Sequence, residues 1–199
     1  MADRAADARR LAVSRRRTLP VVLSAVALGA ALSSCSGAGY ASSATSTTAT
    51  LARCAHGALG VTADAGGMAG LGHAGVRVVY TNRGATACSI VGYPSVVPVT
   101  AAGRRGPPAL ATPSGYLGGA PGTGAARRVV VLAHGARASS IVEGTDVPVG
   151  SATSCPSFVA LLVAPPGGTA ARLAVELPGC SRLLVHPVVA GASGQAAGQ

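Results

Sequence analysis

Four cysteines constrain the fold of this chain more than any other feature of its sequence. They stand at positions 54, 88, 155 and 180, while a fifth, Cys35, lies apart from them near the N-terminus. An even number of cysteines in an exported chain predicts two disulfides, because oxidising compartments favour them. Three pairings exist. We favour Cys54–Cys88 and Cys155–Cys180, because each pair closes one half of the chain.

The N-terminal residues have the pattern of an export signal. An arginine cluster, Arg15-Arg16-Arg17, precedes an apolar run over residues 21–32. This run is shorter than the roughly 20 residues that span a bilayer, which is typical of a signal peptide. It ends in Leu32-Ser33-Ser34-Cys35, which resembles a lipobox. We therefore expect residues 1–34 to be removed and Cys35 to carry a lipid that anchors the protein to the outer face of the cytoplasmic membrane. The alternatives are ordinary signal cleavage, with secretion, and export by the twin-arginine route.

Composition divides the remaining chain into three parts. Residues 36–52 are rich in Ser, Thr, Ala and Gly without periodicity, and we expect 35–52 to form the lipid attachment site and a flexible tether. Residues 190–199 are expected to form a disordered tail for the same reason. The folded domain is then predicted over residues 53–189.

The predicted domain consists of short strands. The chain has 28 Gly, 13 Pro and no Lys, which favours turns over long helices. Apolar residues alternate with other residues over 76–81 and 172–177, and residues 158–163 form a continuous apolar run. Further strands are expected near 57–63, 87–91, 96–100, 128–132, 136–142 and 183–188. Eight or nine such strands predict an all-β fold, an antiparallel β-sandwich.

One long segment, residues 101–126, has no periodicity and is rich in Gly, Pro and Ala. Loops of this length in a compact domain are often functional or mobile. Tyr116 and Leu117 are its most prominent large apolar residues. The segment is either a recognition loop that uses these two residues or plain disorder.

Charge argues against a nucleic-acid partner. The net charge is +10, but after residue 34 ten arginines and four acidic residues are scattered along the chain. Nucleic-acid binding surfaces cluster basic residues, usually beside stacking aromatics, and this chain has no Trp and one Phe. We interpret the charge as a solvated basic surface that can lie near anionic envelope polymers; an envelope protein or polymer is the expected kind of partner.

Known catalytic, cofactor and metal motifs are missing from the sequence. Residues 70–75 match G-x-G-x-x-G, but a strand follows instead of preceding them, and no acidic residue lies between Asp64 and Glu143. The cysteines lack C-x₂-C zinc spacing. The four histidines are His56, His73, His134 and His186. They also lack the spacing of metal ligands, although the fold could still bring three of them together. The four acidic residues are interpreted as turn or strand-surface residues, with Glu143 in a loop after strand 136–142. We therefore predict no catalytic residue, cofactor or metal site.

The domain resembles a family known as domain of unknown function 4232, found in actinobacterial lipoproteins and secreted proteins. The resemblance covers residues 54–189 and implies an immunoglobulin-like sandwich with two disulfides, but no activity. It rests on the four cysteines and on these further residues: Gly72-His73, Tyr80-Thr81-Asn82, Gly92-Tyr93-Pro94, Leu132, Gly135, Ala138, Pro165-Pro166-Gly167, Val185 and Pro187-Val188.

These observations favour a non-enzymatic, lipid-anchored protein of the cell envelope that acts as a binding or structural module. One alternative is a carrier of a small ligand or metal that uses the histidines and the 101–126 loop. A hydrolase is the third hypothesis; it would need one of the four acidic residues to orient a histidine.

Overall fold

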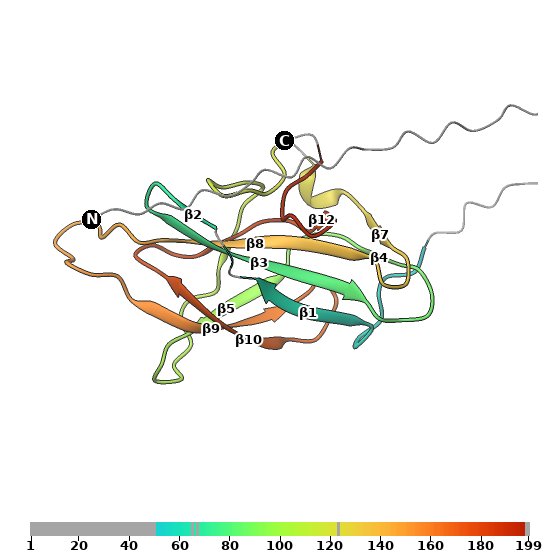
Figure 1. Cartoon of the computed structure of the whole chain (residues 1–199), viewed down its shortest axis with the longest axis horizontal. Helices are drawn as coiled ribbons and strands as arrows, with labels where there is room; N and C mark the ends of the chain where they lie inside the picture. Colours follow the sequence, from blue (N-terminus) through green and yellow to red (C-terminus); the bar gives the residue numbers. More distant parts are fainter. Residues whose placement is uncertain (1–50, 65, 67, 123, 198–199) are drawn as a thin grey trace, which may run out of the picture. The chain divides into compact units, whose positions relative to one another are not determined.

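The computed structural model describes residues 51–64, 66, 68–122 and 124–197, and its architecture is all-β (Figure 1). The predicted signal peptide, Cys35 and most of the predicted tether lie outside the described residues. Twelve strands are present among the described residues. The sequence predicted eight or nine; the strands that it did not predict, β2, β6 and β12, have only two residues each and show no periodicity. No helix in the described part is long and apolar enough to cross a membrane.

The largest sheet contains seven strands, with β1, β3 and β8 side by side, followed by β11 and β6. β2 pairs with β3, and β12 pairs with β8. All these pairs are antiparallel except β6–β11, which is parallel and departs from the predicted antiparallel arrangement. The bounds are β1 Leu59–Asp64, β2 Ala69–Gly70, β3 His73–Asn82, β6 Leu110–Ala111, β8 Arg137–Thr145, β11 Leu184–Val185 and β12 Val189–Ala190.

Two smaller sheets complete the fold. The first has the order β10-β9-β5 and packs against β1, β3 and β8. The second pairs β4 with β7, and the short 3₁₀ turn η1 precedes β7. Their bounds are β4 Cys88–Ile90, β5 Ser95–Val99, η1 Ala125–Arg127, β7 Val130–Leu132, β9 Ser157–Ala164 and β10 Ala171–Pro178.

The core lies between the two packed sheets and is mainly aliphatic. Alternate residues of β3, namely Val76, Val78 and Tyr80, are buried, as the sequence pattern predicted. The same holds for alternate residues of β10. Because these side chains leave water on folding, each buried Val or Leu contributes about 1.5–3 kcal/mol of transfer free energy. The core therefore needs few aromatic side chains.

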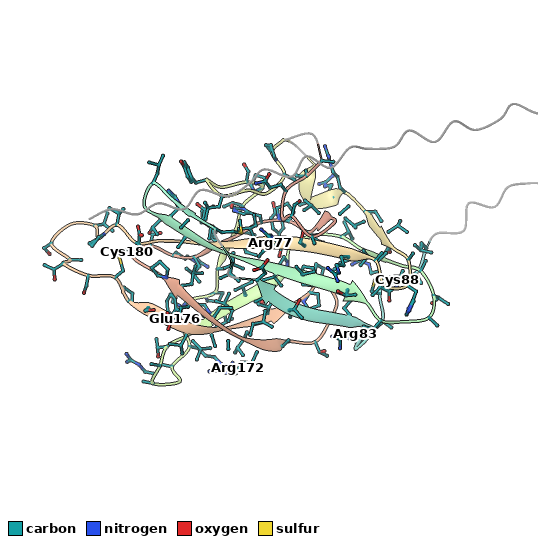
Figure 2. The ribbon with its side chains drawn as sticks, viewed as in Figure 1. Arg77, Arg83, Cys88, Arg172, Glu176 and Cys180 are labelled. Atoms are coloured by element: carbon teal, nitrogen blue, oxygen red, sulfur yellow. A yellow bond between two sulfur atoms is a disulfide. The ribbon has the colours of Figure 1, made fainter. Side chains whose placement is uncertain are left out.

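Both predicted disulfides are present, with the pairing that we favoured. Cys54 is bonded to Cys88, and Cys155 to Cys180. Cys88 and Cys180 lie toward opposite ends of the molecule in Figure 2. The bridges close sequence separations of 34 and 25 residues. On the loop-entropy model, each bridge stabilises the fold by about 3–4 kcal/mol.

Strand β8 is longer than the sequence predicted, and this changes the interpretation of Glu143. β8 continues to Thr145 because β3 begins at His73 and pairs with it along this whole length, with Gly75 opposite Glu143. The expectation that Glu143 lies in a loop or on a strand surface was wrong: its side chain is buried inside the sheet.

The long loop and the C-terminal tail expected from the sequence both make specific contacts with the sheets. Residues 110–119 run beside β11 and return toward β8, with hydrogen bonds from the Leu110 and Thr112 amides to carbonyls of β11 and its neighbour. In the C-terminal segment, Ser139 Oγ accepts a hydrogen bond from the Gly194 amide, and the Ala196 amide donates to Gly119. The described part of the predicted tail, up to residue 197, is thus hydrogen-bonded to the domain.

Candidate functional site

A buried carboxylate in the middle of the largest sheet organises the most polar cluster of the described residues. Glu143 lies in β8 with 1% of its side chain exposed. Its Oε1 accepts a hydrogen bond from the Tyr116 amide at 3.2 Å, and its Oε2 accepts one from the Leu117 amide at 3.1 Å. One side chain of the sheet therefore holds the backbone of the 101–126 segment, for which the sequence left a recognition loop and plain disorder as alternatives.

His186 lies beneath the loop and contacts the Glu143 carboxylate. Its side chain is fully buried, and Nε2 lies 3.3 Å from Glu143 Oε2. On the other side of the ring, Nδ1 lies 3.2 Å from both the hydroxyl and the carbonyl oxygen of Thr112. The imidazole thus connects the carboxylate to the first residues of the loop.

His73, the first residue of β3, reaches the same carboxylate from the opposite side. Its Nδ1 lies 2.5 Å from Glu143 Oε1. The direction of this contact does not suit a hydrogen bond, and Nδ1 is buried without any hydrogen-bond partner among the described residues. We therefore treat the contact as electrostatic, and it becomes an ion pair when His73 is protonated. The His73 ring also stacks on Tyr116, with centroids 4.8 Å apart and planes inclined by 19°.

Two opposing effects set the pKa of the Glu143 carboxyl. Burial is the largest single effect and raises the pKa, because it removes the charged form from water. The hydrogen bonds from the Leu117 amide, from His186 and from the Tyr116 amide act in the other direction, as does the charge of His186. Together they outweigh burial, so the pKa lies below its ordinary value and Glu143 is ionised at neutral pH.

Glycines let the loop approach this cluster closely. A Cβ atom at Gly115 would lie within 2.7 Å of His186 Nε2 and closer still to Glu143 Oε2. A Cβ atom at Gly75 would lie 2.7 Å from Leu117 Cδ1, so the Leu117 side chain packs directly onto β3. The loop is therefore fitted to the sheet at its backbone and at Leu117.

The two predicted recognition residues consequently have different roles. Leu117 is partly buried against β3, whereas 54% of Tyr116 is exposed above His73. A pocket of about 270 Å³ opens beside them, lined by residues 114–119, Pro121 and Gln195. The Gly119 amide donates to Gly194, so the C-terminal segment forms one wall of this pocket. Tyr116 and the pocket are the parts of the loop available to a ligand.

The cluster is arranged for holding the loop rather than for binding a metal ion. The two histidines contact different oxygens of one carboxylate, and both oxygens already accept backbone hydrogen bonds. No group of three or more His, Cys, Asp or Glu side chains within the described ranges is arranged to hold a metal ion. The other two histidines, His56 and His134, are exposed and lie outside the cluster.

The same atoms form a carboxylate–imidazole–hydroxyl relay, the arrangement that hydrolases use to activate a nucleophile. In one tautomer, His186 Nε2–H donates to Glu143 and the Thr112 hydroxyl donates to Nδ1. A hydrolase also needs the imidazole to reach the leaving group of a substrate. His186 is fully buried beneath the loop, so the relay here joins the loop to the sheet.

The sequence did not reveal this cluster because its members are far apart in the chain. Thr112, Glu143 and His186 are brought together by the parallel pairing of β6 with β11 and by the pairing of β11 with β8. The two residues of β6 show no pattern, and although a strand was expected at 183–188, the sequence does not indicate which strands pair with it. One local signal existed: Glu143 continues the run Ile141-Val142, which places a charge at the end of an apolar stretch.

The fold and the cluster define a disulfide-bonded all-β module with a loop fixed by a buried carboxylate. The chain belongs to the family described as domain of unknown function (DUF4232), whose model matches residues 54–190. This confirms the resemblance inferred from the cysteines and the neighbouring motifs. No curated protein and no solved structure matches the chain.

Proposed function

We propose that this protein is a non-enzymatic module of the cell envelope, exported and anchored through a lipid on Cys35, which presents the loop around Tyr116 to a partner. Two features of the sequence support the location: the apolar run that ends in Leu32-Ser33-Ser34-Cys35, and a cysteine set that forms two disulfides. Disulfides persist mainly in oxidising compartments outside the cytoplasm. The partner is an envelope protein or polymer.

The observation that carries the binding role is the clamp on the loop by Glu143. Burying a charged group costs hydration free energy, and a well-packed apolar side chain of similar size is often equally stabilising or better. The buried carboxylate instead fixes the backbone at Tyr116 and Leu117. A loop that is held in one conformation loses less entropy on binding, which raises affinity. Presentation of Tyr116 is the role that this arrangement favours.

The packing of the sheets also supports a more specific proposal about the fold. Two packed sheets with mostly antiparallel pairing support the immunoglobulin-like sandwich that the family resemblance implies. Sandwiches of that kind commonly bind partners through loops at their ends. The proposed presentation of Tyr116 is consistent with this use of the scaffold.

Photo-crosslinking in intact cells tests the proposal. A photoreactive amino acid is placed at Tyr116 in the anchored protein, and a matched control carries it at Arg172, an exposed position on β10. We expect one discrete crosslinked species from position 116 and none from position 172. Crosslinking that is equally diffuse from both positions would contradict a specific partner at the loop.

The pocket beside Tyr116 favours a second candidate, a carrier of a small ligand. Its volume of about 270 Å³ lies just below the roughly 300–1,000 Å³ typical of ligand pockets, which fits only a small molecule. A metal carrier is the related alternative, but no group of three or more His, Cys, Asp or Glu side chains among the residues that the structure describes is arranged to hold a metal ion. Native mass spectrometry of the purified protein separates the candidates: a bound small molecule or stoichiometric metal that is lost in His73→Ala would favour a carrier.

A further inference from the structure

Strand β7 leaves one of its edges without a partner. Its only strand partner among the described residues is β4, where Val131 stands opposite Ser89. The backbone of Ser89 bonds instead to Ala52 and Cys54, at 2.8 and 2.9 Å. Ser89 and Val131 are therefore a non-hydrogen-bonded pair, in which the N–H and C=O of Val131 point away from β4. No other backbone group in the described part of the chain bonds to them.

Apolar side chains accompany this free edge. Val129 and Val131 are 62% and 60% exposed, whereas Val130 and Leu132 point into the core. A groove of about 410 Å³ lies between β7 and β12, which are neighbours in Figure 1 but are not paired with each other. Its apolar lining includes Val129, Val131, Val188, Val189 and Ala196.

Several other edge strands carry protective features that β7 lacks. Exposed strand edges pair with other chains unless charges, proline or a covering segment protects them. β10 displays Arg172 and Glu176 on its outer face (Figure 2), and β5 contains Pro98. β1 ends in Asp64, which forms an ion pair with Arg77. Among the described edge strands with three or more residues, β7 carries neither a charge nor a proline in the strand itself, so its edge is protected only by its short length.

Charge indicates which kind of chain would occupy this edge. Arg127 and Arg128 are exposed directly before β7, and Arg128 lines the groove. None of the four acidic residues after residue 34 lines the groove. With ten arginines in the same part of the chain, the net charge there is +6. A second copy would be repelled, whereas an acidic segment would be attracted.

We propose that the free edge of β7 and the groove beside β12 bind an extended acidic segment of another polypeptide as an added strand. The N–H and C=O of Val131 form backbone hydrogen bonds to the added strand, as in other cases of strand addition. Alternate side chains of that strand pack on Val129 and Val131. Its acidic residues lie at Arg127 and Arg128. This surface is separate from the Tyr116 loop, and the inference does not depend on the function proposed for that loop.

A peptide-binding experiment with the full chain tests this inference. The probe is a labelled decapeptide with alternating valine and threonine and two glutamates at each end; a second probe has lysines in place of the glutamates. Fluorescence anisotropy measures both affinities. We expect the acidic probe to bind more tightly, with a difference that shrinks as salt is added because salt screens exposed charges.

Substitutions at Val131 then test whether the acidic probe binds at the β7 edge. Val131→Pro removes the outward N–H without removing a hydrogen bond to β4, and proline is tolerated on edge strands. We expect about a tenfold loss of affinity for the acidic probe, the effect of losing one hydrogen bond with its side-chain contacts. Val131→Thr keeps the N–H and the branched side chain, and should bind like the wild type.

Charge reversal keeps the inference testable if the proline variant does not fold. Arg128→Glu should weaken binding of the acidic probe, whereas Arg172→Glu, an equal change of charge on β10, should leave it unchanged. Undiminished binding to Val131→Pro, equal binding of the two probes, or no binding would each overturn the proposal. So would a dimer, detected by sedimentation, that Val131→Pro abolishes, because a second copy would then occupy the edge.

Discussion

A carboxylate that is buried in a sheet loses its hydration, and Glu143 regains that free energy from four neighbours. Three of them, the Tyr116 and Leu117 amides and the His186 ring, form hydrogen bonds to it, and the fourth, His73, contacts it without a hydrogen bond. Each hydrogen bond to a charged group contributes about 1.5–3 kcal/mol. Removing the charge therefore affects the loop and the stability of the sheet together.

Glu143→Gln should lower the free energy of unfolding by about 2–4 kcal/mol at pH 7, because an amide accepts these hydrogen bonds less well and its NH₂ group faces other donors. Since the pKa of Glu143 is lowered by folding, its contribution is present above the ordinary glutamate pKa of about 4.3 and is lost as the pH falls below it. Urea unfolding at pH 7, 5 and 3 measures both effects.

The matched control for this substitution is Glu176→Gln, at an exposed position on β10. It should stay within about 0.5 kcal/mol of the wild type at pH 7, as surface substitutions usually do. If Glu143→Gln matched this control, or lost stability in acid as steeply as the wild type, the carboxylate would not be the clamp.

At the residue scale, the sequence predicted positions whose environment depends on local periodicity. The inward faces of β3 and β10 belong to this class. The two disulfide pairings were predicted on another ground, because each closes one half of the chain. The environment of Glu143 does not depend on local periodicity, because its donors come from residues about 26 positions earlier and 43 positions later. A charged residue near the end of a predicted strand is normally exposed, and that general expectation was wrong here.

At the scale of elements, the loop from Thr112 to Gly119 behaves as a covering segment that fits onto β8 and β11. Gly115 lies at its closest approach to the cluster, and its φ is not in the left-handed region. The backbone at this position therefore accepts alanine, and only the contact with Glu143 and His186 opposes it. A substitution at Gly115 therefore tests the close packing of the loop on Glu143 and His186 without straining the backbone of the loop.

Gly115→Ala should destabilise the protein by about 1–3 kcal/mol, the usual cost of overpacking. It should also speed hydrogen exchange of the Tyr116 and Leu117 amides, because the loop must lift away from Glu143. Thermal unfolding and exchange monitored by NMR give the two measurements. Ser114→Ala, one residue earlier, serves as the control and should change neither. Unaltered exchange in Gly115→Ala would mean that the loop does not depend on this close approach.

The long strands were predictable as elements, and the short ones were not. Strands such as β3 and β9 have enough residues for alternation or for an apolar run to be visible. β6 and β12 have two residues each, too few to show a pattern, and depend on pairing with a neighbouring strand, whereas β11 lies within the strand expected at 183–188. For the same reason, the 101–126 segment gave no sign in its sequence that part of it joins the largest sheet.

At the scale of the whole molecule, composition predicted the all-β class, and the cysteine count predicted its two bridges. The arrangement of sheets depends on contacts between distant segments, which no local pattern encodes. Anchoring is a property of the whole chain as well, and it remains a prediction because Cys35 lies outside the described residues. The lipid would tie the domain to the membrane through residues 36–52.

Cys35→Ala should move the protein from the membrane fraction to the medium, since the lipid is the proposed attachment and the apolar run before it is proposed to be a signal peptide that is removed on export. Cell fractionation followed by immunoblotting measures the distribution. Ser36→Ala, one residue further on, should stay in the membrane fraction. Retention of Cys35→Ala at the wild-type level would show that the anchor lies elsewhere.

The position of the Cys54–Cys88 bridge has a mechanical consequence. Ala52 and Cys54 are hydrogen-bonded to Ser89, and the disulfide joins Cys54 covalently to Cys88. A pulling force on the chain ahead of Cys54 therefore passes through the sulfur atoms into β4. The segment between the two cysteines, which contains β1, β2 and β3, carries no tension along its length. A domain held by a tether at this end can withstand drag or tugging without unravelling from its first strands.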